Sequence, residues 1–290
     1  MTNNTPLHQA LAKFEELLKS SGRANATILA YTKDIEQLVE FVVQSGKTTP
    51  VQIETGDINA FKDYLAEKSY TAKSISRKIN SIKSFFRFLM TEKEITSNPA
   101  EQITHPKYDL NPPRILTKIE YRALRDSCRE DTRISAIIEL LLQTGIRIGE
   151  LANLTIEDID LKEDQLTVKP YESQGGRSVP LNQAAKESLE RYMKDRPRTQ
   201  INNLFITKTG NRFLVRNIRS SIDRFFRMAG IENARVNDLR HTFIAHQLIS
   251  GTPLVYVSKL VGHKRLSTTE RYLELVKEKV NREHPKLEQL

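Results

Sequence analysis

Apolar residues recur every three or four positions through most of the first hundred residues, a spacing that predicts amphipathic helices. Four stretches show it: residues 6–22, 27–46, 55–68 and 71–92. Gly22 and Gly46 close the first two stretches, and glycine commonly ends a helix because it tolerates a left-handed backbone. The pattern therefore predicts a small helical domain at the N-terminus.

The stretch 71–92 has two faces of different chemistry. At 100° per residue, its isoleucines and phenylalanines fall on one side, and the other side carries Lys73, Arg77, Lys83 and Arg87. No acidic residue lies between Glu67 and Glu92. A charged helix face usually meets solvent, and this stays the alternative interpretation. A face of one sign without nearby acids favours contact with phosphate, so we predict that this face binds DNA.

The helical spacing stops at residues 98–117, which contain Pro99, Pro106, Pro112 and Pro113. A proline-rich stretch without periodicity is typical of a linker between domains. We therefore expect an N-terminal helical domain at residues 1–102, a linker at 103–115 and a second domain at 116–290.

The second domain is predicted to combine helices with a short β element. Helical spacing returns at residues 118–128, 133–145, 146–154, 182–195, 215–230, 237–251 and 255–262. Leu166, Val168 and Val179 alternate with polar neighbours, which predicts short strands joined by a turn through residues 173–176. An S-x-x-E pattern at residues 267–270 predicts a capping box that opens a last helix, with Tyr272 in its second turn. The expected fold class is mainly α with a small β-sheet.

The charge and composition indicate which classes of partner the chain can have. The formal net charge is +9, and nearly all of the excess lies after residue 110. This favours a nucleic acid partner. The one cysteine, Cys128, and six histidines without close metal-ligand spacing predict neither an internal disulfide nor a bound metal. No apolar run approaches the ~20 residues of a membrane helix, and the N-terminus lacks a signal-peptide pattern. We expect a cytoplasmic protein with no membrane partner.

The C-terminal part gathers a phenol, two imidazoles and a guanidinium within a short stretch: Arg240, His241, His263 and Tyr272. Gly262 breaks the preceding helix, so a turn can bring His263 and Tyr272 together. A phenol with a pKa of ~10 is a poor nucleophile. It can attack phosphorus when its proton is removed and cationic groups neutralise the phosphate. Such phosphoryl transfer can proceed without a metal when side chains supply enough positive charge.

A second arginine, Arg147, lies in the segment T-G-I-R-I-G-E-L and has apolar neighbours. These neighbours predict a half-buried side chain, which needs an anion, either Glu150 or a ligand phosphate. Each of these residues alone is ordinary, since a single tyrosine in an amphipathic helix usually belongs to the core or the surface. The combination carries the functional argument.

Three motifs together resemble the tyrosine recombinases. They are T-G-x-R-x-x-E-L at residues 144–151, D-L-R-H-T-F at 238–243 and G-H-x-x-x-x-T-T-x-x-Y at 262–272. The chain is most similar to Xer-type recombinases and to the compact integrases of mobile elements, and the similarity spans nearly its whole length. It implies a SAM-like helical N-terminal DNA clamp followed by an α+β catalytic domain.

The resemblance also implies roles for individual residues. Tyr272 would be the nucleophile that forms a 3′-phosphotyrosyl bond and releases a 5′-hydroxyl. Arg147 and Arg240 would hold the scissile phosphate, and His263 would help to stabilise the transition state. A supporting shell would consist of Glu150 and His241. Neither ATP nor another cofactor is implied.

Two positions depart from the family pattern. The family usually has a histidine three residues before the second arginine, where this chain has Asn237, whose amide can bind a phosphate oxygen but cannot shuttle a proton. The family also has a lysine in the β-hairpin that acts as the general acid. Counting back from Val179, that position falls at Glu172, and the nearest lysine is Lys169. Lys169 is therefore our candidate for the acid.

The resemblance implies double-stranded DNA with inverted half-sites as the partner, and four protomers on two duplexes, formed by this chain or with a related recombinase. A DNA translocase or a DNA-bending protein is a candidate accessory partner. The role would be resolution of chromosome or plasmid dimers, or integration and excision of a mobile element. Residues 276–290 would dock on a neighbouring protomer or form a frayed polar end. Two alternatives stay open: a type IB topoisomerase-like nicking–closing enzyme, and a DNA-binding relative with impaired catalysis.

Overall fold

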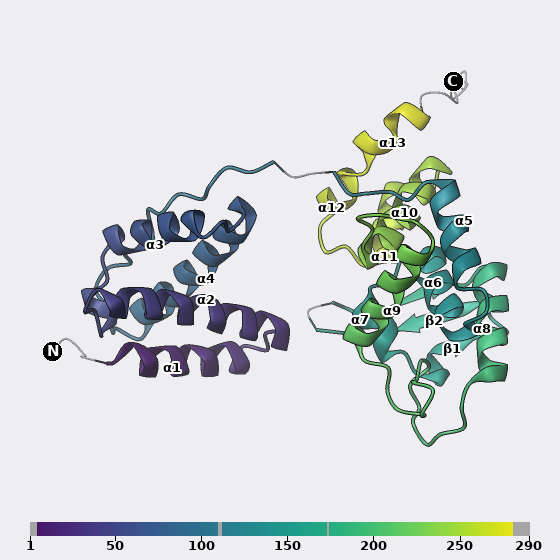
Figure 1. Ribbon diagram of the computed structural model, residues 1–290, viewed down its shortest axis with the longest axis horizontal. Coiled ribbons are helices and arrows are strands. Elements are labelled where there is room, and N and C mark those ends of the chain that lie inside the picture. The colour runs from purple at the N-terminus through teal and green to yellow at the C-terminus, as the bar shows by residue number, and fades with distance from the viewer. Residues whose placement is uncertain (1–4, 110–111, 173, 281–290) are drawn as a thin grey trace. The chain divides into compact units, whose positions relative to one another are not determined.

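The computed structural model describes residues 5–109, 112–172 and 174–280, with side chains to residue 276. The chain divides into two compact units, Met1–Leu110 and Asn111–Leu290, each with its own hydrophobic core (Figure 1). The division falls inside the proline-rich stretch. No helix in the described ranges is long and apolar enough to cross a membrane.

The first unit is built from four helices, which lie where the apolar spacing predicted them. They are α1 (Leu7–Ser20), α2 (Asn25–Gln44), α3 (Thr55–Glu67) and α4 (Ala72–Thr91). Helix α4 packs against the other three, and its apolar face is buried. Phe14 of α1 meets Phe85 of α4 edge to face, with ring centroids 5.3 Å apart. Because this contact turns the apolar face of α4 into the bundle, the opposite face with the basic residues lies on the outside.

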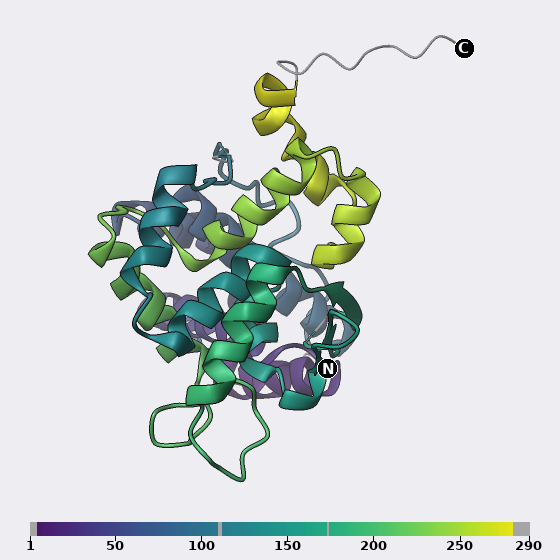
Figure 2. The ribbon, with the colours of Figure 1, turned by 90° about the vertical axis from the view of Figure 1, so that its right-hand side faces the viewer.

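The second unit is mainly helical with one small sheet, so the predicted fold class is confirmed. Its helices are α5 (Lys118–Ser127), α6 (Thr132–Thr144), α7 (Ile148–Asn153), α8 (Gln183–Asp195), α9 (Val215–Met228), α10 (Val236–Ile249), α11 (Leu254–Val261), α12 (Ser267–Glu270) and α13 (Leu273–Val280). Helices α10 and α11 pack together, and α12 and α13 lie beside them (Figures 1 and 2).

The sheet is antiparallel, in the order β1–β2–β3, with β1 at Ile159–Asp160, β2 at Gln165–Val168 and β3 at Arg177–Pro180. Leu166 pairs with Val179, so the alternation predicted β2 and β3 correctly. Strand β1 has two residues, too few for an alternating pattern to show. Ser173, in the predicted turn between β2 and β3, lies outside the described residues.

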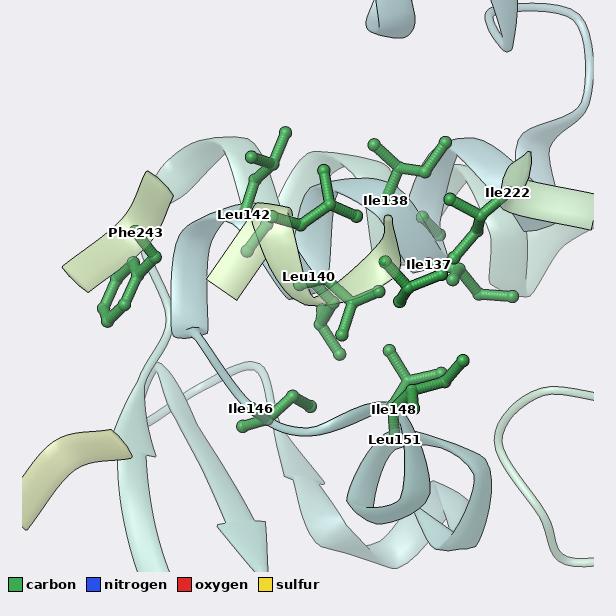
Figure 3. Close-up of a cluster of buried hydrophobic side chains, with 14 of the residues drawn as sticks. Ile137, Ile138, Leu140, Leu142, Ile146, Ile148, Leu151, Ile222 and Phe243 are labelled. Atoms are coloured by element: carbon green, nitrogen blue, oxygen red, sulfur yellow. The ribbon is translucent and has the colours of Figure 1, made fainter. Parts of the chain in front are cut away.

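Helix α6 packs against α8 and α10 in the second core, and Figure 3 shows several of its buried side chains. Its buried residues include Ile137, Ile138, Leu140 and Leu142. Gly145 ends α6 with a left-handed φ of 62°, and a Cβ there would overlap the ring of Phe243 on α10. This close approach brings the segment that follows α6 against α10. Arg147 and Arg240 are thereby carried to the same place.

The last helix differs from the prediction. Helix α12 begins at Ser267 with Leu266 as its cap residue, and no side-chain hydrogen bond caps it. The capping-box prediction was therefore wrong, and so was the placement of Tyr272 in a second helical turn. The helix breaks after Glu270, and Tyr272 lies in the turn before α13. Leu266 has a helical rather than an extended backbone, and an extended cap residue is what the capping box needs.

Candidate active site

The last carbonyl groups of α11 bind three arginines that come from different parts of the second unit. Gly262 ends α11 with a left-handed φ of 68°. Arg240 of α10 donates to the carbonyl oxygen of Val261 at 2.6 Å, and also to that of Gly145. Arg147 donates to the carbonyl oxygens of Val261 at 3.3 Å and Gly262 at 2.9 Å. A helix C-terminus carries partial negative charge, so it stabilises these cations.

Arg240 and Arg147 form a strongly positive and partly enclosed site. Arg240 is 7% exposed, and 31% of the Arg147 side chain is accessible. Burial and the charge of Arg147 lower the pKa of Arg240 to about 9, so Arg240 is still protonated at neutral pH. The buried Arg240 and the half-buried Arg147 carry like charges that destabilise each other, and a bound anion would relieve that repulsion. The pair is thus suited to bind an anionic group.

Glu150 connects the third arginine to Arg147. Its carboxylate accepts hydrogen bonds from Arg177 Nη1 at 2.9 Å and Nη2 at 2.8 Å. It also accepts from the backbone N–H of Arg147 at 2.8 Å and from Arg147 Nη1 at 3.1 Å. Burial by itself would raise the pKa of Glu150, but the bonds from Arg177 and Arg147 hold it below its usual value. Glu150 therefore stays ionised and positions both guanidinium groups.

Arg177 was missed by the sequence analysis. Its Nε donates to the carbonyl oxygen of Leu260 at 2.7 Å, which joins β3 to the end of α11. A signal was present in the segment R-S-V-P, because Arg177 lies two residues before the buried Val179. Side chains two apart on a strand share one face, so an arginine on this face needs a buried acid.

The buried Tyr272 forms a hydrogen bond with His241 of α10. Tyr272 Oη and His241 Nδ1 are 2.6 Å apart, and the phenol side chain is 4% exposed. Burial raises the pKa of Tyr272, although the charges of Arg240 and Arg271 oppose the effect. Burial also lowers the pKa of His241. The phenol is thus protonated and the imidazole is neutral at pH 7.

His263 has a different partner from the one that its sequence position suggested. Its Nδ1 lies 2.7 Å from Oγ1 of the buried Thr269, whereas Tyr272 pairs with His241. Burial and the charges of Arg240 and Arg147 lower the pKa of His263 to about 4. His263 is therefore a neutral hydrogen-bonding group at physiological pH and lies near both arginines.

The two departures from the family pattern lie at exposed positions. Asn237 is exposed in the first turn of α10. The side chain of Lys169 is 58% exposed and pairs with Asp158 at 2.8 Å and with Thr155 Oγ1 at 3.3 Å. The hydrogen bond to Asp158 raises the pKa of Lys169. Within the described residues, Lys169 is not hydrogen-bonded to the cluster around Arg147. Glu172 has a left-handed φ of 52° near the tip of the β2–β3 connection.

The basic face of α4 is partly neutralised. Arg77 and the buried Lys78 both bind the buried carboxylate of Asp34 on α2, so the acid that the sequence pattern lacked comes from another helix. Lys83 donates to the carbonyl oxygen of Glu101 at 3.2 Å. The other two residues of the face, Lys73 and Arg87, are exposed and have no ion pair within the described part of the chain.

The second unit thus offers a buried phenol hydroxyl, a neutral imidazole in contact with it, and two arginines placed so that they can bind an anion. In the described ranges, no group of three or more His, Cys, Asp or Glu side chains is arranged to hold a metal ion. The residues can bind a phosphate-like group, remove a proton from a phenol and stabilise negative charge at phosphorus.

Comparisons with known sequences cover both units. The profile described as Phage integrase family matches residues 114–279, and the profile described as Phage integrase, N-terminal SAM-like domain matches residues 11–93. Tyrosine recombinase XerC of Thermodesulfovibrio yellowstonii is 33% identical, over 87% of this chain and 86% of that protein. Tyrosine recombinase XerC of Staphylococcus saprophyticus is also 33% identical, over 88% of each.

Three solved structures are similar to this chain over nearly its whole length. The XerA recombinase crystal structure is 27% identical with a TM-score of 0.55, and the match covers 97% of this chain and all of that one. A lambda integrase dimer bound to a COC′ core site matches 100% of this chain and 82% of that one, at 20% identity and a TM-score of 0.76. The Tn1549 transposon integrase in complex with transposon right end DNA matches 96% and 99%, at 18% identity and a TM-score of 0.79. The last two likenesses show the fold.

Proposed function

The chain belongs to the phage integrase family of tyrosine recombinases, and we propose that it cleaves and rejoins specific DNA sites through a 3′-phosphotyrosyl bond to Tyr272. The observation that carries the proposal is the meeting of three features: a buried phenol, a neutral imidazole at 2.6 Å from it and two arginines on the carbonyl groups of α11.

In the proposed reaction, Arg147 and Arg240 bind the non-bridging oxygens of the scissile phosphate. Tyr272 Oη attacks the phosphorus, and the 5′-oxygen leaves. Because His263 is neutral, it acts as a hydrogen-bond donor to the developing charge and not as a cation. The phosphotyrosyl bond conserves the energy of the original phosphodiester, so attack by a 5′-hydroxyl reseals the strand without ATP.

The leaving 5′-oxygen needs a proton, and Lys169 stays our candidate for the general acid. It would have to leave Asp158 when DNA binds, which its exposed and flexible stem permits. Asn237 would contribute a hydrogen bond to a phosphate oxygen. Both assignments require movement or contacts that the DNA itself would supply.

The proposed partner is double-stranded DNA with inverted half-sites, bound by four protomers on two duplexes. The lambda and Tn1549 integrases were each solved with DNA, which supports DNA as the partner of this chain. The DNA-contacting residues of α4 would be Lys73, Arg77, Lys83 and Arg87. The predicted docking tail, residues 276–290, lies largely outside the described residues. Resolution of chromosome or plasmid dimers and movement of a mobile element are the two candidate roles.

A suicide substrate tests the proposal. A nick placed beside the scissile phosphate lets the released fragment diffuse away, so the covalent complex accumulates and is seen on a denaturing gel. We expect an adduct with the wild-type chain and none with Tyr272→Phe, which removes one hydroxyl and should still bind DNA. Binding without an adduct in the wild-type chain would favour an impaired relative. Relaxation of supercoiled DNA without strand exchange would favour a nicking–closing enzyme.

A further inference from the structure

Attack by Tyr272 requires a group that accepts its proton. The phenol is protonated at pH 7, because burial raises its pKa. Three side chains of the site deserve comparison as acceptors: His263, Asn237 and His241. His263 already uses Nδ1 in its bond to Thr269. Asn237 is exposed, and its amide cannot take a proton at neutral pH.

His241 satisfies the geometric requirement directly. Its Nδ1 lies 2.6 Å from Tyr272 Oη, within the range for proton transfer without an intervening water. The neutral imidazole can accept the phenolic hydrogen at Nδ1 when its own hydrogen is on Nε2. We propose that His241 is the general base of strand cleavage and takes the Tyr272 proton as the phenol attacks. This proposal rests on the proposed function.

The charged groups around His241 suit a base that must work near neutral pH. Asp238 and Arg240 face it from its own helix, Arg271 and Tyr272 face it from the turn after α12, and His263 lies nearby after α11. Burial lowers the pKa of His241, Arg240 and Arg271 lower it further, and Asp238 opposes them. The imidazole is therefore neutral before the reaction.

After proton transfer, Asp238 stabilises the imidazolium. The two residues are three apart on α10, so their side chains lie on neighbouring parts of one face. The carboxylate of Asp238 is buried and accepts a hydrogen bond from the backbone N–H of Arg235, which fixes its position. A fixed negative charge near His241 lowers the free energy of the charged state that forms during attack.

The proposed step balances. A bond forms between Tyr272 Oη and the scissile phosphorus, and the bond from phosphorus to the 5′-oxygen breaks. The phenolic proton moves to His241 Nδ1, and the 5′-oxygen receives a proton from a separate acid or from water. During resealing, the 5′-hydroxyl attacks, and the imidazolium returns its proton to the departing phenol.

The assignment also accounts for Asn237. Residues 237 and 241 are four apart on α10, so they occupy one face of that helix, one turn from each other. The family's usual histidine at this position could accept a proton, whereas the amide of Asn237 cannot. With His241 as the base, the chain retains an acceptor on the same face, and it is the one that contacts the nucleophile.

The test changes the phenol instead of the base. Tyr272 is replaced by 3,5-difluorotyrosine through amber suppression, because fluorine withdraws electrons and makes the phenol ionise near neutral pH. This protein and the wild-type chain are each combined with His241→Gln, which keeps a polar side chain but cannot accept a proton. Single-turnover cleavage of the suicide substrate is measured from pH 5.5 to 9. His246→Gln, at an exposed histidine of the same helix, is the matched control.

With the natural phenol, His241→Gln should slow cleavage by at least ~100-fold at pH 7, since a general base typically contributes ~100- to 10,000-fold. Its rate should climb with pH as the phenol ionises unaided. Difluorotyrosine should restore most of the lost rate at pH 7, and His246→Gln should cleave like the wild-type chain. If His241→Gln cleaves normally, or stays equally slow with difluorotyrosine, His241 is not the base.

Two controls distinguish loss of the general base from misfolding and from failure of the proposed function. DNA affinity and melting temperature show whether His241→Gln folds, and His241→Asn carries the same test if the glutamine variant does not. If the wild-type chain and the difluorotyrosine protein both fail to form an adduct, the proposed function fails and not only the base. If His241 only positioned the phenol, His241→Gln would slow cleavage equally with tyrosine and with difluorotyrosine. A rate that difluorotyrosine restores therefore shows that His241 accepts the proton.

Discussion

Arg177 donates hydrogen bonds to both carboxylate oxygens of Glu150, and this ion pair is almost fully buried. Glu150 uses the same oxygens to bind the backbone and the side chain of Arg147. Strand β3 is therefore coupled to the anion site through one acid. The hairpin that carries the candidate general acid and the arginines proposed to bind phosphate are parts of a single network.

Removal of Arg177 should damage stability and catalysis together. Arg177→Ala leaves the buried Glu150 with one cationic partner, and breaking a buried pair typically costs about 3–5 kcal/mol. We expect a loss of this order in the free energy of unfolding, measured by urea titration, and slower formation of the covalent adduct. Arg177→Lys keeps the positive charge, so it should recover part of the stability and part of the adduct-forming rate. The recovery should be incomplete, because a lysine cannot make the paired bonds to Glu150.

The matched control is Lys186→Ala, which breaks the more exposed pair between Lys186 and Asp164. Surface pairs contribute about 0–1 kcal/mol, so this change should be nearly silent. Equal effects of Arg177→Ala and Lys186→Ala on unfolding would show that Arg177 does not hold the network together.

Stability should fall as the solution becomes more acidic than pH 6.5, in part because of His263. Its folded pKa is about 4, below the value of 6.5 in an unfolded chain. Between these values the unfolded state binds more protons, so acid favours unfolding, by up to about 1 kcal/mol per pH unit from this group. His263→Gln should flatten the dependence between pH 6.5 and 4. An unchanged slope in that variant would mean that His263 titrates normally in the folded protein.

The basic face of α4 should separate into residues that bind DNA and one that also stabilises the fold. Lys73→Ala, Lys83→Ala and Arg87→Ala should each weaken binding to any DNA sequence. Each should also reduce the slope of log affinity against log salt by up to ~1. Their unfolding free energies should stay close to that of the wild-type chain.

Arg77→Ala should behave differently, because Arg77 shares the buried carboxylate of Asp34 with Lys78. We expect measurable destabilisation in urea in addition to weaker DNA binding. If all four variants keep the wild-type salt slope, the face is simply exposed to solvent. If Arg77→Ala has the same free energy of unfolding as Lys73→Ala, the contact between Arg77 and Asp34 does not stabilise the fold.

Lys169→Ala should slow cleavage by at least ~100-fold if Lys169 is the general acid. A substrate with sulfur at the 5′-bridging position needs no proton on the leaving group, so it should restore most of the rate. Lys162→Ala, at an exposed lysine in the turn between β1 and β2, should cleave both substrates normally. Equally slow cleavage of the sulfur substrate by Lys169→Ala would assign the proton to another donor. Glu172→Ala should change the rate little.

Local spacing in the sequence predicted most helices, and short motifs singled out Arg147 and Arg240, which the structure brings together at the end of α11. Gly145 and Gly262 were recognisable as helix ends, and their left-handed backbones are what direct Arg147 and His263 into the site. The contact between His241 and Tyr272 was not predicted, since it depends on how α10 packs against α13.

The missed features share one physical cause, which is pairing between distant segments. Arg77 finds Asp34 on another helix, and Arg177 finds Glu150 from another element. Neither partner is visible from spacing along one helix or strand. The failed capping box at Ser267 is a separate case, because α12 begins one residue earlier than the S-x-x-E pattern places it, with Leu266 as the cap residue.

The most direct test of the account is to identify the atom that holds DNA after cleavage. The trapped complex is digested with protease and nuclease, and the modified peptide is sequenced by mass spectrometry. We predict a nucleotide joined through its 3′-phosphate to Tyr272, and a free 5′-hydroxyl on the released strand. A nucleotide on another residue, such as the exposed Tyr256 of α11, or a 5′-phosphate linkage to the protein would contradict the account.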